Sequence, residues 1–178
     1  MLYRPVEEDQ KITLAIYHEE YYEALMRFYL PIHQLRFTAL PMNVLQEAIT
    51  DKNRLPVVIL DGNTPVGFFV LQTGEDISVF TSNPYAVLLR AFSVNYPDQR
   101  KGHAKRALQL LPQFIFENIH SINEIVLAVN TDNKRAKKLY EKMGYQYQRR
   151  IRYGFLRMRS VLQYRLPIGN SKLLVINK

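Results

Sequence analysis

The sequence predicts a mixed α/β fold, in which one sheet contains a strand–helix–strand unit near its middle. Three observations support this fold class. The predicted elements follow the order strand, two helices, three strands, helix, strand, helix, two strands. The turn sequence DGNT at 61–64 joins two apolar segments as a hairpin. Residues 122–130 contain a continuous apolar run, IVLAV, which is typical of a strand covered on both faces.

The N-terminal third is predicted to contain one strand and two helices. Residues 11–18 alternate weakly between apolar and polar side chains, as a strand does. From Glu19 onward apolar residues recur at helical spacing until Pro31 ends the pattern. Pro41 opens a short second helix, because proline is tolerated in a first helical turn.

The middle of the chain is predicted to hold three strands and one helix. The hairpin strands PVVIL and PVGFFVLQ are followed by a polar segment, 73–85, which we expect to be a loop or a ragged edge. A third strand, VLLRAFSVN, runs into a turn with a single glycine, Gly102, and a helix follows at once. Pro112 is expected to kink that helix rather than to end it.

The C-terminal part is predicted to contain a strand, a helix and two closing strands. After the apolar strand, Asp132 or Asn133 can cap the helix, and Gly144 suits its C′ position. The remainder alternates well enough for two strands around Gly154. We expect one domain over residues 1–178, with a tail over 167–178.

Composition narrows the range of functions. The absence of cysteine excludes disulfides, thiolate nucleophiles and cysteine metal sites. There is no apolar run of about 18 residues and no secretion signal, so we expect a cytoplasmic protein with no membrane partner. The four histidines lack metal-ligand spacing, and no metal is expected.

The charge is divided unequally along the chain. Residues 1–98 contain 7 Lys and Arg against 12 Asp and Glu, a net charge of −5, whereas residues 99–178 contain 17 against 4, a net charge of +13. A protein that brings an anionic ligand to a cationic partner could use both signs, although two solvated faces of different sign would give the same count.

The turn at 99–104 raises a question about its basic residues. Arg100, Lys101, Lys105 and Arg106 lie in or near the first turns of a helix, where the macrodipole is already positive. A phosphate bound to the free N–H groups of the helix N-terminus would explain them. The P-loop and dinucleotide fingerprints both fail here, which leaves the pattern Gln99-x-x-Gly102-x-Ala104. Alone, that pattern also fits a tight helix entry.

A second motif distinguishes these readings. Asn133 begins the pattern N-x-x-A-x-x-L-Y-E-K-x-G-Y, which ends at Tyr145. Together and in this order, the two motifs resemble the GCN5-related N-acetyltransferase (GNAT) superfamily over roughly residues 88–150. The resemblance implies a mixed, mostly antiparallel sheet of about six to seven strands, splayed between the fourth and fifth, with about four flanking helices. It also implies acetyl-CoA as the co-substrate, bound in that opening.

The resemblance assigns binding roles residue by residue. The backbone of Arg100 to Lys105 would hold the pyrophosphate, with Gly102 allowing close approach because it lacks a Cβ. Phe92 to Val94 would pair like a strand with the pantetheine amides, and Asn133 and Ala136 would line its other side. The cofactor-binding residues implied are Phe92, Ser93, Val94, Gln99, Arg100, Lys101, Gly102, His103, Ala104, Lys105, Asn133, Ala136 and Tyr140.

Transfer of an acetyl group to an amine needs a proton acceptor and a proton donor. The resemblance implies Tyr140 as the donor to the leaving thiolate, although its spacing from Ala136 also fits a core stripe. Many relatives carry a carboxylate base on the fourth strand, whereas this chain has Arg90 there. Glu75, and beside it Asp76, could act through a water molecule or could be solvated loop acids.

These observations predict an N-acetyltransferase that moves the acetyl group of acetyl-CoA to a primary amine directly, in a ternary complex. Two alternatives stay open: a CoA-binding sensor without turnover, and an RNA-associated module that uses the arginines and aromatics of RRIRYGFLRMR. A nucleic acid partner is the less favoured reading, and a homodimer is left open. The aromatics Tyr22, Phe28, Tyr29 and Phe37 and the acids Glu19, Glu20 and Glu23 suggest a cationic acceptor with an apolar body, either a small molecule or a peptide.

Overall fold

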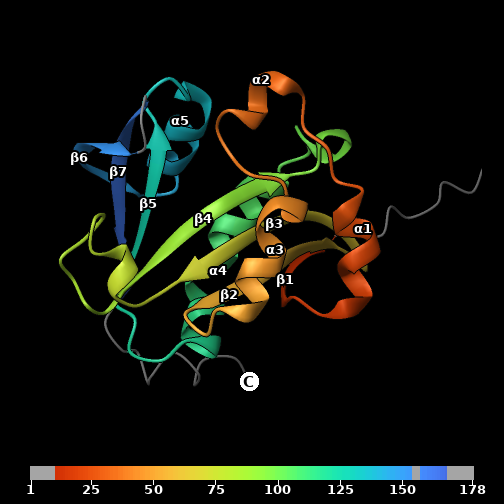
Figure 1. The fold of residues 1–178 in the computed structure, drawn as a ribbon, viewed down its shortest axis with the longest axis horizontal. Coiled ribbons are helices and arrows are strands. Elements are labelled where there is room, and N and C mark those ends of the chain that lie inside the picture. Colours follow the sequence, from red (N-terminus) through yellow and green to blue (C-terminus); the bar gives the residue numbers. More distant parts are fainter. Residues whose placement is uncertain (1–10, 154–156, 168–178) are drawn as a thin grey trace, which may run out of the picture.

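The computed structural model describes residues 11–153 and 157–167 (Figure 1). In chain order the elements are β1 Ile12–Ile16, the 3-10 turn Glu19–Tyr21, α1 Tyr22–Met26, α2 Ile32–Leu35, α3 Pro41–Thr50, β2 Arg54–Asp61, β3 Thr64–Gln72, the 3-10 turn Glu75–Ile77, β4 Ala86–Val94, the 3-10 turn Tyr96–Asp98, α4 His103–Asn118, β5 Glu124–Asn130, α5 Lys134–Lys142, β6 Gln146–Tyr153 and β7 Arg157–Arg165.

Within the described residues the strands form one mixed sheet of seven strands in the order β1-β2-β3-β4-β5-β7-β6. The pairing of β4 with β5 is parallel, and the other pairings are antiparallel. The long connection through α4 is what a parallel pair requires, whereas β2 and β3 are joined directly at Gly62, whose φ is +58°. The predicted fold class and hairpin are confirmed.

The sheet opens between β4 and β5. Their parallel pairing covers Ala86–Leu89 of β4 and Glu124–Leu127 of β5, and it stops there although both strands continue. A bulge lies just beyond that point, because Ala91 and Phe92 together face one residue, Phe69, of β3. Ala91 has φ = +52°. The bulge bends β4 away from β5, and the two strands diverge toward the N-terminal end of α4.

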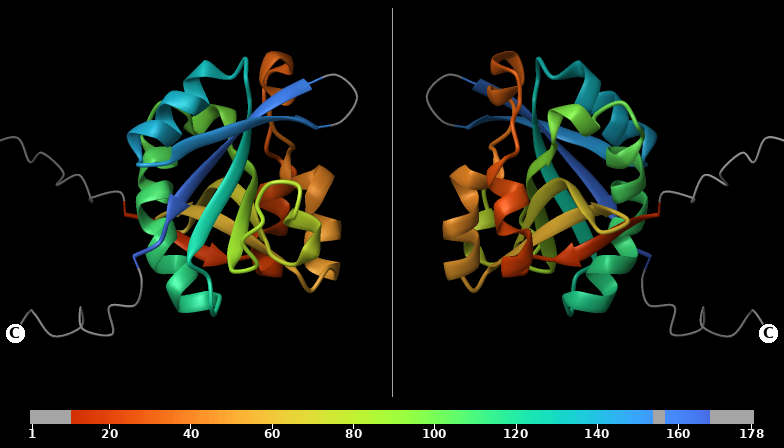
Figure 2. Two further views of the ribbon diagram at one scale, coloured as in Figure 1. Left: turned by 90° about the vertical axis from the view of Figure 1, so that its left-hand side faces the viewer. Right: turned by 90° about the vertical axis from the view of Figure 1, so that its right-hand side faces the viewer.

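Helices cover both faces of the sheet (Figure 2). On one face α4 packs on a core that includes Phe69, Leu89 and Ile125. On the other face α1 and α3 pack over Val58 and Phe68. Because Phe68 and Phe69 are adjacent in β3, their burial on opposite faces follows from the two-residue period of a strand. The continuous burial of the central strands agrees with the prediction for a sheet covered on both sides.

The first helices are shorter than the periodicity predicts. The helical pattern from Glu19 resolves into a 3-10 turn and α1, which ends at Met26, and a separate α2 follows Pro31. Leu25 is fully buried, so the apolar spacing here reports packing rather than helix length. The predicted tail over 167–178 lies outside the described residues apart from Pro167. No helix in the part of the chain that the structure describes is long and apolar enough to cross a bilayer.

Candidate cofactor and acceptor site

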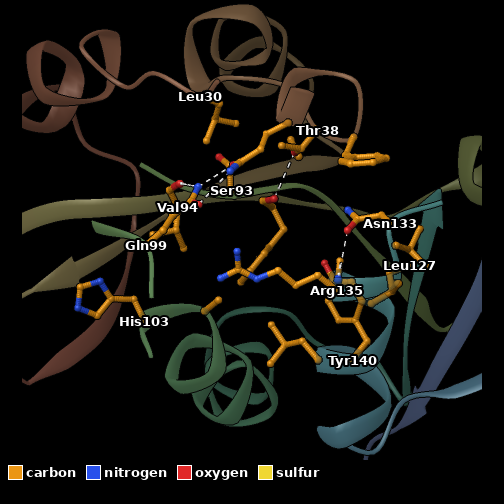
Figure 3. Close-up of a pocket in the computed structure, with 18 of the residues that line it drawn as sticks. Leu30, Thr38, Ser93, Val94, Gln99, His103, Leu127, Asn133, Arg135 and Tyr140 are labelled. Atoms are coloured by element: carbon orange, nitrogen blue, oxygen red, sulfur yellow. Dashed lines mark hydrogen bonds between the residues drawn. The ribbon is translucent and has the colours of Figure 1, made fainter. Parts of the chain in front are cut away.

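A cavity of about 500 Å³ occupies the opening between β4 and β5 (Figure 3). Five parts of the chain line it: the segment around α2, the second half of β4, the turn before α4, the end of β5, and α5. The lining residues that bear on the chemistry are Leu30, His33, Gln34, Phe37, Thr38, Arg90, Phe92, Ser93, Val94, Asp98, Gln99, Arg100, Gly102, His103, Ala104, Lys105, Asn133, Arg135, Ala136 and Tyr140.

The turn before α4 presents backbone donors to this cavity. Arg100 and Gly102 adopt left-handed φ values of +65° and +85°, which reverse the chain just before the helix. No side chain caps α4, and the first intrahelical bond of its N-terminus is from the N–H of Arg106 to the carbonyl of Gly102. The N–H groups of the preceding helical residues therefore have no partner within the helix. A Cβ at Gly102 would meet no heavy atom within 4 Å.

Positive charge surrounds that turn. Arg100, Lys105 and Arg135 line the cavity, and Figure 3 shows Arg135 reaching into it from α5. Asp98, whose carboxylate accepts a hydrogen bond from Lys101 at 3.1 Å, is the one acid among the described lining residues. Lys101 itself is not among them. The turn thus combines free N–H groups with a net positive charge, an arrangement suited to phosphate.

His103 is the first residue of α4, and its side chain is almost fully buried. Its Nε2 atom lies 3.5 Å from an oxygen of Asp61, at the end of β2. Its Nδ1 atom has no hydrogen-bond partner among the described residues. His103 is among the residues that line the cavity, while its imidazole contacts Asp61 of β2.

On the β4 side of the cavity, two backbone carbonyls already accept hydrogen bonds from side chains. The hydroxyl of Thr38 donates to the carbonyl of Phe92 at 3.2 Å, and Gln99 Nε2 donates to the carbonyl of Val94 at 3.0 Å. Gln99 also exchanges hydrogen bonds with Gln34, which ties the turn to α2. A ligand that pairs with this edge must use the N–H groups or the remaining carbonyl lone pairs.

The opposite side is formed by α5. Asn133 caps this helix by accepting a hydrogen bond from the N–H of Ala136 at 3.2 Å, which confirms the predicted cap. One turn further, the side chain of Tyr140 is buried at the inner end of the cavity. Its ring meets Phe92 edge-on, with centroids 6.4 Å apart. Burial raises the pKa of Tyr140 well above the usual value for tyrosine, so its hydroxyl keeps its proton.

The structure brings together nearly all the predicted cofactor residues. Every one except Lys101 lines the cavity. Glu75 is exposed on the 3-10 turn after β3 and is not among the lining residues, so its water-mediated role stays a prediction. The acids Glu19, Glu20 and Glu23 are likewise exposed and outside the lining. Of the aromatics proposed for acceptor binding, Phe37 lines the cavity, whereas Phe28 is buried in a core.

Sequence reasoning did not identify the segment around α2 residue by residue, nor Arg135. His33, Gln34 and Thr38 come from a part of the chain with no motif, and tertiary packing places them over β4. Arg135 could have been found, because it lies between the two motif positions Asn133 and Ala136 on the same helical turn. Among the described residues no group of three or more His, Asp or Glu side chains is arranged to hold a metal.

Comparison with known proteins agrees with this geometry. Residues 18–145 match the model of the acetyltransferase (GNAT) family. The chain is 40% identical over 156 residues to the uncharacterized N-acetyltransferase YbbJ of Bacillus subtilis (strain 168), an alignment that covers 87% of this chain and 98% of that protein.

Solved structures share the fold at low sequence identity. AAC(6')-Ib, in complex with paromomycin and acetyl-CoA, has a TM-score of 0.67 at 16% identity, covering 86% of this chain and 93% of that chain. The ribosomal-protein-S18-alanine N-acetyltransferase from Escherichia coli has a TM-score of 0.65 at 16% identity, covering 92% and 99%. With the family match over most of its length and the splayed strands that the motifs predict, the chain belongs to the GNAT family of acetyltransferases.

Proposed function

We propose that this acetyltransferase binds acetyl-CoA along the opening between β4 and β5 and passes the acetyl group directly to a primary amine in a ternary complex. The observation that carries the proposal is one cavity, which is lined by free N–H groups and basic side chains at the turn before α4 and by the buried side chain of Tyr140. Acetyl-CoA has matching chemistry, with phosphates at one end and a thioester at the other.

The turn would hold the phosphates. The free N–H groups at the start of α4 can donate to the pyrophosphate, and Arg100, Lys105 and Arg135 add charge. Gly102 matters for two reasons: its φ of +85° disfavours any side chain, and the space where a Cβ would lie is left to the ligand. These groups explain why basic residues occur where the helix dipole alone would disfavour them.

The inner end would carry out the transfer. The neutral amine nitrogen forms a bond to the acetyl carbon, the carbon–sulfur bond breaks, the amine loses one proton and the thiolate gains one. Tyr140 would donate the proton to sulfur, and its raised pKa keeps that proton available at neutral pH. The amine would attack in its neutral form, and the proton that its nitrogen loses would pass to water, with Glu75, beyond the cavity, as the proposed acceptor acting through that water.

The RNA-binding alternative gains no support from the arrangement of its residues. The described residues of the stretch, 149–153 and 157–159, lie in β6 and β7 of the sheet. Arg150 and Arg152 pair along the strand with Ser160 and Met158, and the guanidinium of Arg149 donates to the carbonyl of Val79 at 3.0 Å. Strand pairing and a solvated face account for these arginines. The sensor alternative predicts CoA binding without thiol release, which an assay of turnover distinguishes.

The experiment that tests the site is a glutamate substitution at Gly102 with a matched control at Gly62. Both glycines are exposed, both have positive φ (+85° and +58°), and neither has a heavy atom within 4 Å of its Cβ position. The backbone cost should therefore be similar, about 1–2 kcal/mol, but only Gly102 lines the cavity.

Calorimetry with acetyl-CoA gives the readout. We expect Gly62→Glu to bind as the parent does and Gly102→Glu to lose at least about tenfold in affinity, because its carboxylate meets the phosphates. If the parent and a folded Gly102→Glu protein bind acetyl-CoA with equal affinity, the turn before α4 is not part of the binding site.

A further inference from the structure

We infer that the amine acceptor carries an anionic group, a carboxylate or a phosphate, and that Arg90 binds it. The inference rests on the proposed function and specifies the class of its second substrate. It replaces the cationic acceptor suggested by the sequence, because the acids behind that suggestion do not line the cavity.

Arg90 is a half-buried cation without an anionic partner in the described structure. Its Nη1 atom donates to Oε1 of Gln72 at 2.5 Å, and Gln72 is itself buried and neutral. No carboxylate among the described residues lies within 4.0 Å of its guanidinium. A guanidinium has five N–H donors, so most of them are left for another ligand. Taking a charge partly out of water is costly unless an opposite charge compensates for it.

The position of Arg90 places it at the acceptor end of the cavity. It follows Leu89, the last residue of β4 that pairs with β5, so it lies where the two strands begin to diverge. Leu88, two residues earlier, packs in the core on the side opposite α4, and the bulge keeps Ala91 on that side too. Phe92 returns to the α4 side, where it meets Tyr140. Arg90 therefore lies on the face of the sheet opposite α4, where it lines the cavity together with the segment around α2. Phe92 and Tyr140, beside the proposed thioester position, lie on the α4 side.

Acetyl-CoA cannot neutralise this arginine. Its phosphates would lie at residues 99–105, and the pantetheine and acetyl groups that reach toward β4 carry no charge. Arg90 precedes Phe92 by two residues, about 7 Å of strand. An acceptor whose anion is a few bonds from its amine can therefore reach both the guanidinium and the thioester.

The other charges of the cavity favour the same class of acceptor. Arg100, Lys105 and Arg135 would be neutralised by the phosphates of acetyl-CoA, so Arg90 is the described lining arginine left for the acceptor. Asp98, the one lining acid among the described residues, is held by Lys101 at the other end. A second cation, Arg36, stacks on the ring of the lining residue Phe37, 4.4 Å from its centroid. Both arginines would repel a polyamine and attract an anion. They would also lower the pKa of a bound ammonium group, which favours the neutral nucleophile.

The test uses matched amines that differ in the anion. Thiol release from acetyl-CoA is measured with each of the standard amino acids and its carboxamide, with O-phosphoethanolamine and ethanolamine, and with spermidine and glucosamine. The first two sets distinguish a carboxylate from a phosphate. The amine of a carboxamide has a lower pKa than the amine of its amino acid, so more of the carboxamide is in the neutral, nucleophilic form. A preference for the amino acid therefore cannot be explained by the protonation of the amine.

We expect at least one anionic amine to exceed its neutral partner by about tenfold or more in kcat/KM. Arg90→Gln should remove that preference by lowering kcat/KM for the anionic amine alone, and Arg90→Lys should keep part of it. Arg27→Gln is the control, since Arg27 is exposed just after α1, pairs with Glu23 and does not line the cavity.

Three outcomes contradict the inference and are distinguishable. If neutral or cationic amines are acetylated as well as the anionic ones, the acceptor class is wrong and the proposed function stands. The role of Arg90 is wrong if an anionic preference survives Arg90→Gln. If no amine releases thiol although calorimetry shows CoA binding, the proposed transfer fails together with the inference.

Discussion

At the scale of single residues, Tyr140 combines packing with the proposed chemistry. Its ring lies between Phe92 and Tyr145, with centroid distances of 6.4 Å and 5.7 Å, so this residue of α5 contacts both β4 and the segment just before β6. Its side chain also lines the cavity that the other motif residues line. A substitution that keeps the ring therefore distinguishes the two roles.

Tyr140→Phe should lower kcat by roughly 10- to 100-fold, toward the low end of general-acid effects because thiolate is already a fair leaving group. The affinity for CoA and the melting temperature should stay close to the parent values, since the ring and its contacts are retained. Steady-state kinetics with a rate-limiting chemical step is the measurement. A variant with the parent rate would leave Tyr140 as a packing residue.

The buried tyrosines also predict how stability depends on pH. Burial raises the pKa of both Tyr140 and Tyr145 above the unfolded value near 10. Their contribution is fully present below pH 10 and is lost as the pH rises above it, because the unfolded chain releases protons that the folded chain keeps. The free energy of unfolding should fall by up to about 1.4 kcal/mol per pH unit for each of them.

Denaturant unfolding between pH 9 and pH 11 checks this dependence. Tyr145→Phe should reduce the fall in the free energy of unfolding between pH 9 and pH 11, because one buried ionisable hydroxyl is removed. At pH 8 the substitution should change the free energy of unfolding little, because the Tyr145 hydroxyl has no hydrogen-bond partner among the described residues. Tyr85→Phe, at a ring that is 55% exposed, is the control and should keep the parent slope. Identical slopes for Tyr145→Phe and the parent would show that Tyr145 does not resist ionisation in the folded protein.

At the scale of elements, two lysines near the N-terminus of α4 have different surroundings, although the sequence cannot distinguish them. Lys105 lines the cavity, whereas Lys101 is outside the lining and donates to Asp98. Lys105→Ala should raise the KM for acetyl-CoA about 5- to 10-fold with kcat nearly unchanged, as the loss of one charge-assisted contact to phosphate predicts. Lys101→Ala should change KM less than about twofold, because this exposed pair contributes little.

The salt dependence of KM provides the second readout for these lysines. Raising the ionic strength weakens exposed charge–phosphate contacts, so the KM of the Lys105→Ala protein should respond less to salt than the parent KM does. A large kcat loss in Lys105→Ala at constant KM would place this lysine in the chemical step instead.

At the scale of the whole molecule, the proposed ligand bridges the two arms of the splayed sheet. The phosphate turn and β4 lie on one side of the opening, and β5 with α5 lies on the other (Figure 1). A ligand at 100 times its Kd adds about 2.7 kcal/mol to the free energy of unfolding. For a chain of 178 residues, that corresponds to a rise in melting temperature of about 5–10 °C.

Thermal unfolding with and without CoA measures this rise. The Gly62→Glu protein should show the full shift, and the Gly102→Glu protein should show almost none at the same CoA concentration. A parent protein whose melting temperature is unmoved at saturating CoA would contradict binding across the opening.

The sequence by itself determined what depends on neighbours along the chain. The strand periods, the DGNT hairpin, the glycine turn and the Asn133 cap are local, and the structure has each of them where the sequence predicts it, whereas the first helices are shorter than their apolar period predicts. The cofactor half of the site was predictable for the same reason, since Gln99 to Lys105 and Asn133 to Tyr140 are two short segments whose geometry is set within each segment.

Only the tertiary structure decided the acceptor half. Thr38 reaches the carbonyl of Phe92 across 54 positions of sequence, and the segment around α2 encloses Arg90 in one cavity with α5. Neither contact has a local signal, because packing between distant segments creates both. The composition of 19–37 suggested a cation-binding pocket, whereas the fold leaves its acids in solvent and puts an arginine in the cavity. Side-chain charge is a property of the sequence, but which charges share one pocket is a property of the fold.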